Sequence, residues 1–366
     1  MSEPSRVRPN GSTVLAVVAL GLASTGATGC SLFTSLDGLS GGAAAGDGGS
    51  EGSAGAGDSA TALTPRVWRQ ISVEGPPARH SARMAYDEAR NKAVLYGGGG
   101  PTAPDGTQTR EWDGTAWSRP ALVASPTGRS AGGLAYDSDR KVTVLYGGAG
   151  APLEPWEWDG GRGWKSSGVS PSAPAIANGA AIAYDRARHV LVLFGGLRSM
   201  SKNDFVGTVE WTVAGGFVDR KPQVAPPARH ANALVYDVAR SRVVMFGGSS
   251  GTPLGDLWEW DGQAWKERAV TPSPPPRMAP CATYDPVRKV TVIFGGRGDD
   301  ESISFNDTRE WDGTKWRRSG PPGPPACRSC AMAFDVARNA VVMYGGGTRR
   351  GSTTPTEVIG DTWVYE

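Results

Sequence analysis

Residues 84–98 read MAYDEARNKAVLYGG and residues 109–117 read TREWDGTAW, and this pair of segments returns about every fifty residues. The first segment carries an aromatic residue followed by Asp-x-x-Arg, and it ends in an aromatic residue and Gly-Gly. The aromatic residues before the aspartate are spaced 50, 48, 52, 48 and 50 residues apart: Tyr86, Tyr136, Tyr184, Tyr236, Tyr284 and Phe334. A period near fifty with a diglycine and a late tryptophan is typical of one propeller blade. The six copies therefore predict an all-β, six-bladed β-propeller.

Each repeat predicts four short antiparallel strands, A to D. In the first repeat, Ser81–Tyr86 forms strand A, Ala93–Tyr96 forms strand B and Thr109–Trp112 forms strand C. Asp113-Gly114 fits a two-residue hairpin turn, because Asp-Gly tolerates the positive φ angles of such turns. Trp117 then begins strand D. Four strands of this kind make one blade.

The last repeat ends on strand C, at residues 361–366, and lacks a strand D of its own. Residues 66–71 precede the first strand A and carry Trp68, which has no partner in its own repeat. Trp68 lies 11 residues before Arg79, close to the 12 residues between Trp117 and Arg129. We therefore expect residues 66–71 to supply strand D of the last blade, which closes the ring and removes both sheet edges.

Composition and charge exclude several classes of protein. Gly at 52 and Pro at 28 of 366 residues fit an all-β chain that is rich in turns. The net charge is +2, and no run of Lys and Arg is long enough to follow a phosphate backbone, so nucleic-acid binding is not expected. The Gly-Gly pairs lie between predicted strands, whereas a phosphate-binding loop leads into a helix.

The N-terminus has the pattern of an export signal, which defines residues 1–29 as a predicted signal peptide. Arg6 and Arg8 precede an apolar stretch, Thr13–Ala23, that is too short to span a bilayer. Residues 27–30 (ATGC) resemble the end of a bacterial lipobox, which makes Cys30 the predicted lipidation site. This predicts a lipid-anchored protein of the bacterial cell envelope, in the outer membrane. Secretion or periplasmic release after ordinary cleavage, and an uncleaved segment, are the alternatives.

The segment after the predicted signal has the composition of a linker. Residues 30–62 are mostly Gly, Ala, Ser and Asp, and they contain too few large apolar side chains to form a core. A flexible tether after a lipid anchor would hold a folded domain away from the membrane. The predicted domains are therefore a signal peptide (1–29), a disordered tether (30–62) and a propeller (63–366).

The repeats resemble the kelch family and its galactose oxidase-like superfamily. The resemblance covers residues 66–366. It rests on the diglycine after strand B, the aromatic residue before it, the Pro-Arg-like entry to strand A and the downstream Trp. Repeat three departs from the pattern, with Ala177-Asn178 at the Arg position and Phe217 in place of Trp. The Tyr-Asp-x-x-Arg and Glu-Trp-Asp-Gly-x-x-Trp segments are similar to those of bacterial exported kelch proteins.

The loops on one face of the propeller are the candidate binding site. The A–B and C–D turns share one face and hardly differ between repeats, whereas the B–C loops of the other face vary in length. By resemblance to kelch domains that bind peptides, arginines at the entry to strand A form a basic ring suited to carboxylates. The alternative is that each Arg bonds loop carbonyls within its own blade. The candidate residues of the B–C/D–A face are Arg79, His80, Arg129, Arg229, His230, Arg277 and Arg328.

The sequence predicts no metal site, no cofactor and no catalytic residue. His80 and His230 occupy equivalent positions in opposite blades and should face each other across the channel, too far apart to share a metal. His189 belongs to a turn on the other face. Cys281 and Cys330 lie on strands A of adjacent blades, so an exported protein permits a disulfide between them. A Cys327–Cys330 bridge and buried free thiols are the alternatives.

The favoured function is a non-catalytic binding module that recognises a protein segment or a glycan through the B–C/D–A face, as a monomer. The alternative is a carbohydrate-active enzyme such as an acidic-sugar mutarotase, an activity that exists among periplasmic six-bladed kelch propellers. In that case Arg would hold the carboxylate, and an acidic loop residue such as Asp299, Asp300 or Glu301 would move the proton.

Overall fold

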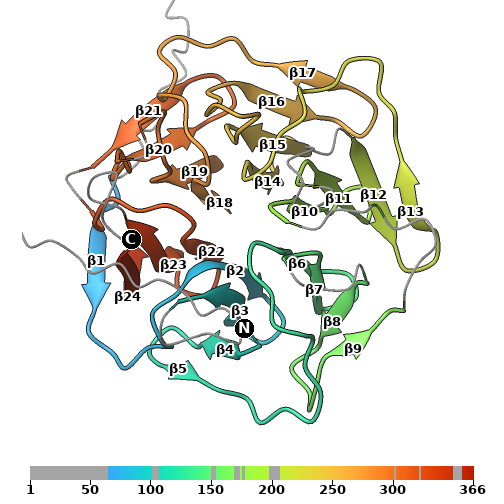
Figure 1. Ribbon diagram of the computed structural model, residues 1–366, viewed down its shortest axis with the longest axis vertical. Helices are drawn as coiled ribbons and strands as arrows, with labels where there is room; N and C mark the ends of the chain where they lie inside the picture. The colour runs from blue at the N-terminus through green and yellow to red at the C-terminus, as the bar shows by residue number, and fades with distance from the viewer. Residues whose placement is uncertain are drawn as a thin grey trace, which may run out of the picture. The chain divides into compact units, whose positions relative to one another are not determined.

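The computed structural model describes residues 65–100, 107–149, 154–168, 174, 178–197, 207–300, 302–320, 323–348 and 357–366. In these residues all regular secondary structure is β-strand, arranged as six four-stranded antiparallel sheets around a central axis (Figure 1). The six-bladed, all-β prediction is confirmed. The predicted signal peptide and the whole predicted tether, residues 1–62, lie outside the described residues. One compact unit covers Thr61–Glu366.

In blades 1 to 3 the four strands follow one another in the chain, from an inner strand A to an outer strand D. Blade 1 contains β2 (His80–Asp87), β3 (Lys92–Gly99), β4 (Thr109–Trp112) and β5 (Trp117–Ser118). Blade 2 contains β6 (Gly133–Asp137), β7 (Val142–Tyr146), β8 (Trp156–Trp158) and β9 (Lys165–Ser166). Blade 3 contains β10 (Ala181–Asp185), β11 (Val190–Phe194), β12 (Thr208–Thr212) and β13 (Gly216–Asp219).

Blades 4 and 5 repeat this order, and blade 6 takes its outer strand from the N-terminal side of the unit. Blade 4 contains β14 (Ala233–Asp237), β15 (Arg242–Phe246), β16 (Leu257–Trp260) and β17 (Trp265–Glu267). Blade 5 contains β18 (Cys281–Asp285), β19 (Val290–Phe294), β20 (Thr308–Trp311) and β21 (Trp316–Ser319). Blade 6 contains β22 (Ala331–Asp335), β23 (Ala340–Thr348), β24 (Glu357–Tyr365) and β1 (Trp68–Ile71).

The ring closes where β1 pairs with β24, as the sequence predicts. Trp68 lies opposite Tyr365, and the two rings stack with their centroids 4.9 Å apart. The Val67 amide donates to the carbonyl oxygen of Glu366 at 2.8 Å. This pairing gives blade 6 four strands like the other blades, and β24 is thereby paired on both of its edges.

The hydrophobic core lies in the layers between neighbouring blades. In one such layer Val144 and Tyr146 of blade 2 pack against Ile182 and Leu193 of blade 3. A strand that is covered on both faces lacks a polar face, which is why β7 reads VTVLY and is buried along almost its whole length. The strands A therefore surround the axis with small and apolar side chains, and these side chains form the wall of the central channel.

The recurring Asp-x-x-Arg turn connects three parts of the molecule. In blade 1 the Arg90 Nε donates to Asp87 at 2.7 Å, and its Nη1 donates to Glu111 of strand C at 2.6 Å. Trp158 of blade 2 donates to the same Glu111 carboxylate at 3.0 Å. Burial would raise the pKa of Glu111, but Lys92 and Arg90 outweigh it and lower the pKa. The motif is therefore a scaffold, in agreement with its presence in every repeat.

The aromatic residue that opens strand D bonds to the preceding blade. Trp265 Nε1 donates to the Thr208 hydroxyl at 2.7 Å, and four blades share this contact. Blade 3 has Phe217 at this position and blade 2 has Pro155 opposite it, so that donor and acceptor are lost together. In blade 5 the Trp316 Nε1 is buried without a hydrogen-bond partner, because Leu257 occupies the threonine position of blade 4.

Candidate binding site at the channel mouth

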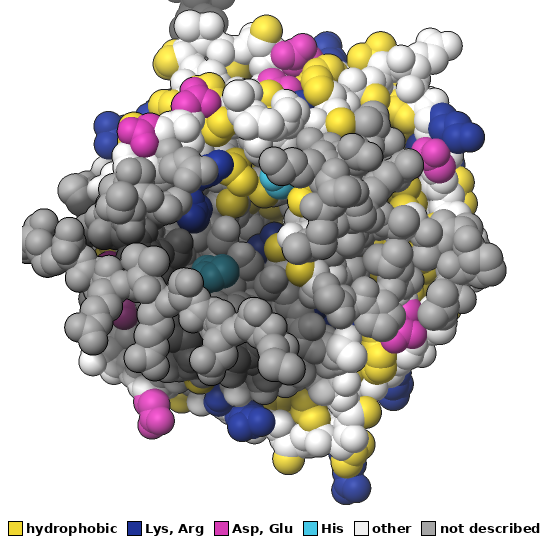
Figure 2. All heavy atoms as spheres, viewed as in Figure 1, with side chains coloured by type: hydrophobic (Ala, Val, Ile, Leu, Met, Phe, Trp, Pro, Cys, Tyr) yellow, Lys and Arg dark blue, Asp and Glu magenta, His cyan; other side chains and the backbone are white. Residues whose placement is uncertain are grey.

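A cavity of about 450 Å³ lies at the channel mouth on the B–C/D–A face (Figure 2). Figure 2 shows a hollow at the centre of this face with histidine and basic side chains around it. The described residues that line the cavity come from all six blades: His80, Ser81, Arg83, Ser130, Ala131, Asn178, Gly179, His230, Ala231, Met278, Ala279, Arg297, Arg328, Ser329 and Gly347.

A closed ring of backbone hydrogen bonds builds this mouth. The residue at the entry to each strand A donates its amide to the carbonyl oxygen of the equivalent residue in the preceding blade, at 2.8 to 3.0 Å. The six members are Ser81, Ala131, Gly179, Ala231, Ala279 and Ser329. All six have φ between 51° and 70°, which five non-glycine residues adopt only at a cost. The circular hydrogen bonding offsets that cost, because it satisfies a donor and an acceptor in each blade.

The residue before each ring member carries its side chain on the cavity. These six residues are His80, Ser130, Asn178, His230, Met278 and Arg328. The backbone repeats around the ring while these side chains differ in size and charge. A regular frame with variable side chains is the arrangement expected of a recognition surface.

The cavity lining is cationic. Arg83, Arg297 and Arg328 contribute three positive charges, and none of the described lining residues is Asp or Glu. Burial lowers the pKa of Arg83 to about 10, which keeps it protonated at neutral pH. Burial, and next the charge of Arg328, lower the pKa of His80, which keeps its imidazole neutral at pH 7. The chemistry of the mouth therefore fits an anionic group.

Of the seven candidate residues, the structure brings His80, His230 and Arg328 together on the cavity. The other four arginines do not line it. Their side chains are almost completely buried within the blades: Arg79, Arg129, Arg229 and Arg277. An Arg one residue away from the cavity-lining position points to the opposite side of an extended chain, toward the interior of its own blade. Of the five arginines expected to form a basic ring, Arg328 alone therefore lies at the position whose side chain lines the cavity.

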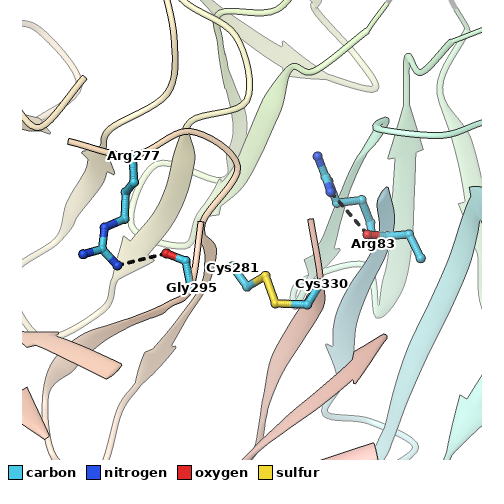
Figure 3. Close-up of a disulfide and its surroundings, with 6 residues drawn as sticks. Arg83, Arg277, Cys281, Gly295 and Cys330 are labelled. Atoms are coloured by element: carbon cyan, nitrogen blue, oxygen red, sulfur yellow. Dashed lines mark hydrogen bonds between the residues drawn. A yellow bond between two sulfur atoms is a disulfide. The ribbon is translucent and has the colours of Figure 1, made fainter. Parts of the chain in front are cut away.

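The four buried arginines instead fasten the loops, as the alternative interpretation describes. Nη1 of each donates to the first glycine of its own diglycine, for example Arg277 to the Gly295 carbonyl at 2.9 Å (Figure 3). The Arg277 Nε donates to the Pro275 carbonyl at 3.1 Å. The Arg277 carbonyl oxygen accepts from Gly248 of the preceding blade at 3.0 Å. In repeat six Cys327 occupies this position and Arg328 follows it, which explains the shift of one residue in the sequence.

Two arginines on the cavity, Arg83 and Arg297, are not among the sequence candidates. Arg83 lies on β2, three residues before Tyr86. The other repeats have only small residues there: Gly133, Ala181, Ala233, Cys281 and Ala331. Arg297 follows a diglycine where the other repeats have uncharged residues. A search for charges that break the repeat would have found both residues.

The described part of the acidic loop of the alternative enzyme does not line the cavity. Asp299 and Asp300 are exposed, and neither lines the mouth. Asp300 accepts hydrogen bonds from the Ser302 amide and hydroxyl at 2.8 and 2.7 Å, which is the geometry of a loop turn. Glu301 lies outside the described residues. His189 lies on the other face and bonds to Asp139.

The opposite end of the channel has a different character. A cavity of about 210 Å³ there is lined by the aromatic residues that open the repeat, Tyr86 through Phe334. At its rim Glu88 of blade 1 forms an ion pair with Arg186 of blade 3. Val238, Pro286 and Val336 complete the rim. Its described charges are thus paired with each other, so that the B–C/D–A mouth is the cationic end.

Cys281, the first residue of β18, and Cys330, the residue before β22, form a disulfide between blades 5 and 6 beside the channel (Figure 3). Cys327 is a buried free thiol. Among the described residues, no group of three or more His, Cys, Asp or Glu side chains is placed to hold a metal ion. In the same part of the chain no helix is long and apolar enough to cross a membrane.

No protein-family model matches the chain, and no curated protein matches it in sequence. Solved structures resemble it in fold. One of them, described as the structure of YjhT, aligns with a TM-score of 0.61 and is 14% identical in sequence. The alignment covers 79% of this chain and 95% of that chain. At this level of identity the similarity supports the six-bladed propeller fold alone.

Proposed function

We propose that this chain is an exported propeller of the kelch type that binds carboxylate-bearing ligands, an acidic protein segment or an acidic glycan, in the cavity at the B–C/D–A mouth. One observation carries the proposal. The cavity of about 450 Å³ has three arginines and two histidines on its wall and no acidic residue among the described ones. Its volume is in the range of ligand sites, roughly 300–1,000 Å³.

The arrangement favours binding over catalysis. The mouth is built on a rigid ring of backbone hydrogen bonds, and its charged groups are cations, which attract an anion but do not remove a proton from it. Arginine presents a planar set of donors that matches a carboxylate. The proposed role is therefore recognition of an anionic group on the cell envelope.

A screen with the full-length chain in detergent, against arrays of acidic glycans and acidic peptides, tests this proposal. The bound ligand should lose at least about tenfold in affinity with Arg328→Gln, since a lost charged hydrogen bond amounts to roughly 1.5–3 kcal/mol. Arg318→Gln, at an exposed position of β21, is the matched control and should leave affinity unchanged. Equal binding by wild type and Arg328→Gln would contradict the placement of the ligand in the mouth.

A second candidate, a mutarotase of acidic sugars, has one observation in its favour. His80 lies on the cavity wall, and its lowered pKa leaves a neutral imidazole that is able to accept a proton. NMR measurement of anomer exchange in an acidic sugar tests it. A rate above the uncatalysed one that His80→Gln abolishes, with binding retained, would favour the enzyme. An unchanged background rate with wild-type protein favours the binding module.

We also propose that Cys30 carries a lipid that holds the propeller at the envelope. The basis is the resemblance of residues 27–30 to a lipobox and the linker composition of residues 30–62. Cys30→Ser should move the protein from the detergent-soluble membrane fraction to the aqueous fraction. Wild-type protein that remains aqueous would favour secretion or periplasmic release.

A further inference from the structure

The channel below the mouth contains one charged side chain among its described lining residues. This section has a volume of about 100 Å³, and its wall is mainly small or apolar, for example Met84, Leu134 and Ile182. Arg83 is the exception. It also lines the mouth cavity, so that a ligand reaches its guanidinium from the B–C/D–A face.

Among the described residues that line the channel, Arg83 has no acidic partner. Its Nη1 donates to the carbonyl oxygen of its own neighbour, Ala82, at 3.3 Å (Figure 3). The described residues around this section include no Asp or Glu. A partly buried guanidinium against a mainly apolar wall loses part of its hydration, and a neighbouring anion offsets that loss. The channel therefore favours a bound negative charge.

Asn232 gives a second, independent indication. It precedes β14 in blade 4, opposite blade 1 in the ring, and it lines the same section of the channel. The residue is 8% exposed, and neither Nδ2 nor Oδ1 has a hydrogen-bond partner. The other strands A have at this position Ala82, Gly132, Ala180, Pro280 and Cys330. Asn232 is thus the one amide in the set, and a buried amide without partners is an unusual cost in a folded protein.

We propose that this section of the channel binds one carboxylate group, with Arg83 as its cation and Asn232 Nδ2 as a further donor. A guanidinium and a neutral amide balance a single negative charge, whereas a phosphate dianion would leave charge uncompensated against the apolar wall. About 100 Å³ is too small for a whole sugar ring or peptide. The carboxylate therefore comes from a small free acid or from the end of a larger ligand seated in the mouth. The second source rests on the proposed function.

Thermal unfolding of the full-length chain in detergent, with sodium acetate replacing sodium chloride at constant ionic strength, tests the site. Wild type should show a saturable rise in Tm, because a ligand that binds only the folded state stabilises it. Arg83→Met should abolish the rise. Asn232→Leu should weaken the apparent affinity about tenfold, the loss expected for one hydrogen bond to a charged group. Arg318→Met is the matched control and should behave as wild type.

Line broadening of ¹³C-labelled acetate in NMR gives a readout that does not depend on stability. Arg83→Met should fold, since five blades have small uncharged residues at this position. Absence of broadening with wild type, or equal broadening with Arg83→Met, overturns the inference. A phosphate series that shifts Tm as strongly as acetate also overturns it.

Competition between acetate and a mouth ligand distinguishes the two sources of the carboxylate. If acetate displaces the ligand, the ligand's own carboxylate occupies the channel. If acetate and the mouth ligand bind together, a small free acid occupies the channel.

The experiments also distinguish failure of the channel site from failure of the proposed function. A mouth ligand that depends on Arg328, together with wild-type protein that does not bind acetate, removes the channel site alone. Acetate binding that depends on Arg83, without any mouth ligand, leaves the channel site and removes the proposed function.

Discussion

The guanidinium of Arg229 donates to both carboxylate oxygens of Asp256, each at 2.6 Å, while its own side chain is fully buried in blade 4. Burial would raise the pKa of Asp256, but the hydrogen bonds and charge of Arg229 outweigh it and lower the pKa. Arg229 therefore belongs to the framework of the B–C loop, and its charge is already neutralised within the blade.

Arg229→Ala should lower the free energy of unfolding by about 3 kcal/mol, because it leaves Asp256 half-enclosed without its cation and removes bonds to two loop carbonyls. Urea unfolding followed by tryptophan fluorescence measures this. In the Arg229→Ala background, Asp256→Ala should lower the unfolding free energy much less than it does in the wild-type protein. Arg318→Ala, at an exposed position, should stay within about 0.5 kcal/mol of wild type. A loss of stability for Arg229→Ala as small as that for Arg318→Ala would contradict the role of Arg229 in the framework of the B–C loop.

The six blades and the closing strand follow from the sequence because they depend on features that repeat. The diglycine is one of them. Gly98 has φ of 87°, and a Cβ there would lie 2.8 Å from the His80 carbonyl oxygen. The second glycine of all six diglycines has a positive φ, between 87° and 119°. Such steric requirements leave a signature in every copy, and six copies make it readable.

The cavity residues were harder to predict, since neighbours on an extended chain face opposite sides. Arg79 points into the blade and His80 lines the mouth, and composition alone does not say which of the two faces the axis. The shift of Arg328 relative to the other arginines was the available signal. Arg83 and Asn232 escaped notice for another reason. A search built on repetition passes over single departures from the repeat, and a binding site in a symmetric frame consists of such departures.

The contact between Thr208 and Trp265 predicts a measurable coupling between blades 3 and 4. Thr208→Val should cost about 1–3 kcal/mol, because it leaves a buried indole donor without an acceptor. In a Trp265→Phe background the same substitution should cost little, as the native Phe217–Pro155 pair suggests. Chemical unfolding of the two single variants and the double variant gives the coupling energy. Additive losses would mean that the hydrogen bond contributes nothing.

The Cys281–Cys330 disulfide should stabilise the junction of blades 5 and 6 by about 4 kcal/mol, the loop-closure estimate for its separation of 49 residues. Replacing both cysteines by serine should lower the unfolding free energy by about this amount, and Cys327→Ala should keep the bridge.

Burial raises the pKa of the Cys327 thiol to about 12, so the thiol should resist iodoacetamide in the folded protein and react after denaturation. Rapid native labelling at Cys327 would contradict this placement.

His80 should titrate below its ordinary pKa of 6.5, because burial and then the nearby Arg328 charge disfavour its protonated form. The unfolded chain therefore binds the proton more readily, and the His80 contribution to stability is present above pH 6.5 and declines as the pH falls below it. Two-dimensional NMR of the imidazole should show its pKa rising toward 6.5 in Arg328→Gln. His189 is an internal control, because its hydrogen bond to Asp139 raises its pKa on the other face. An Arg328→Gln variant that shifts the pKa of His189 but leaves that of His80 unchanged would contradict the effect of Arg328 on His80.

Protonation of His80 adds a positive charge to the mouth. Binding of a carboxylate ligand should therefore strengthen as the pH falls from 7 to 5, and His80→Gln should flatten that dependence.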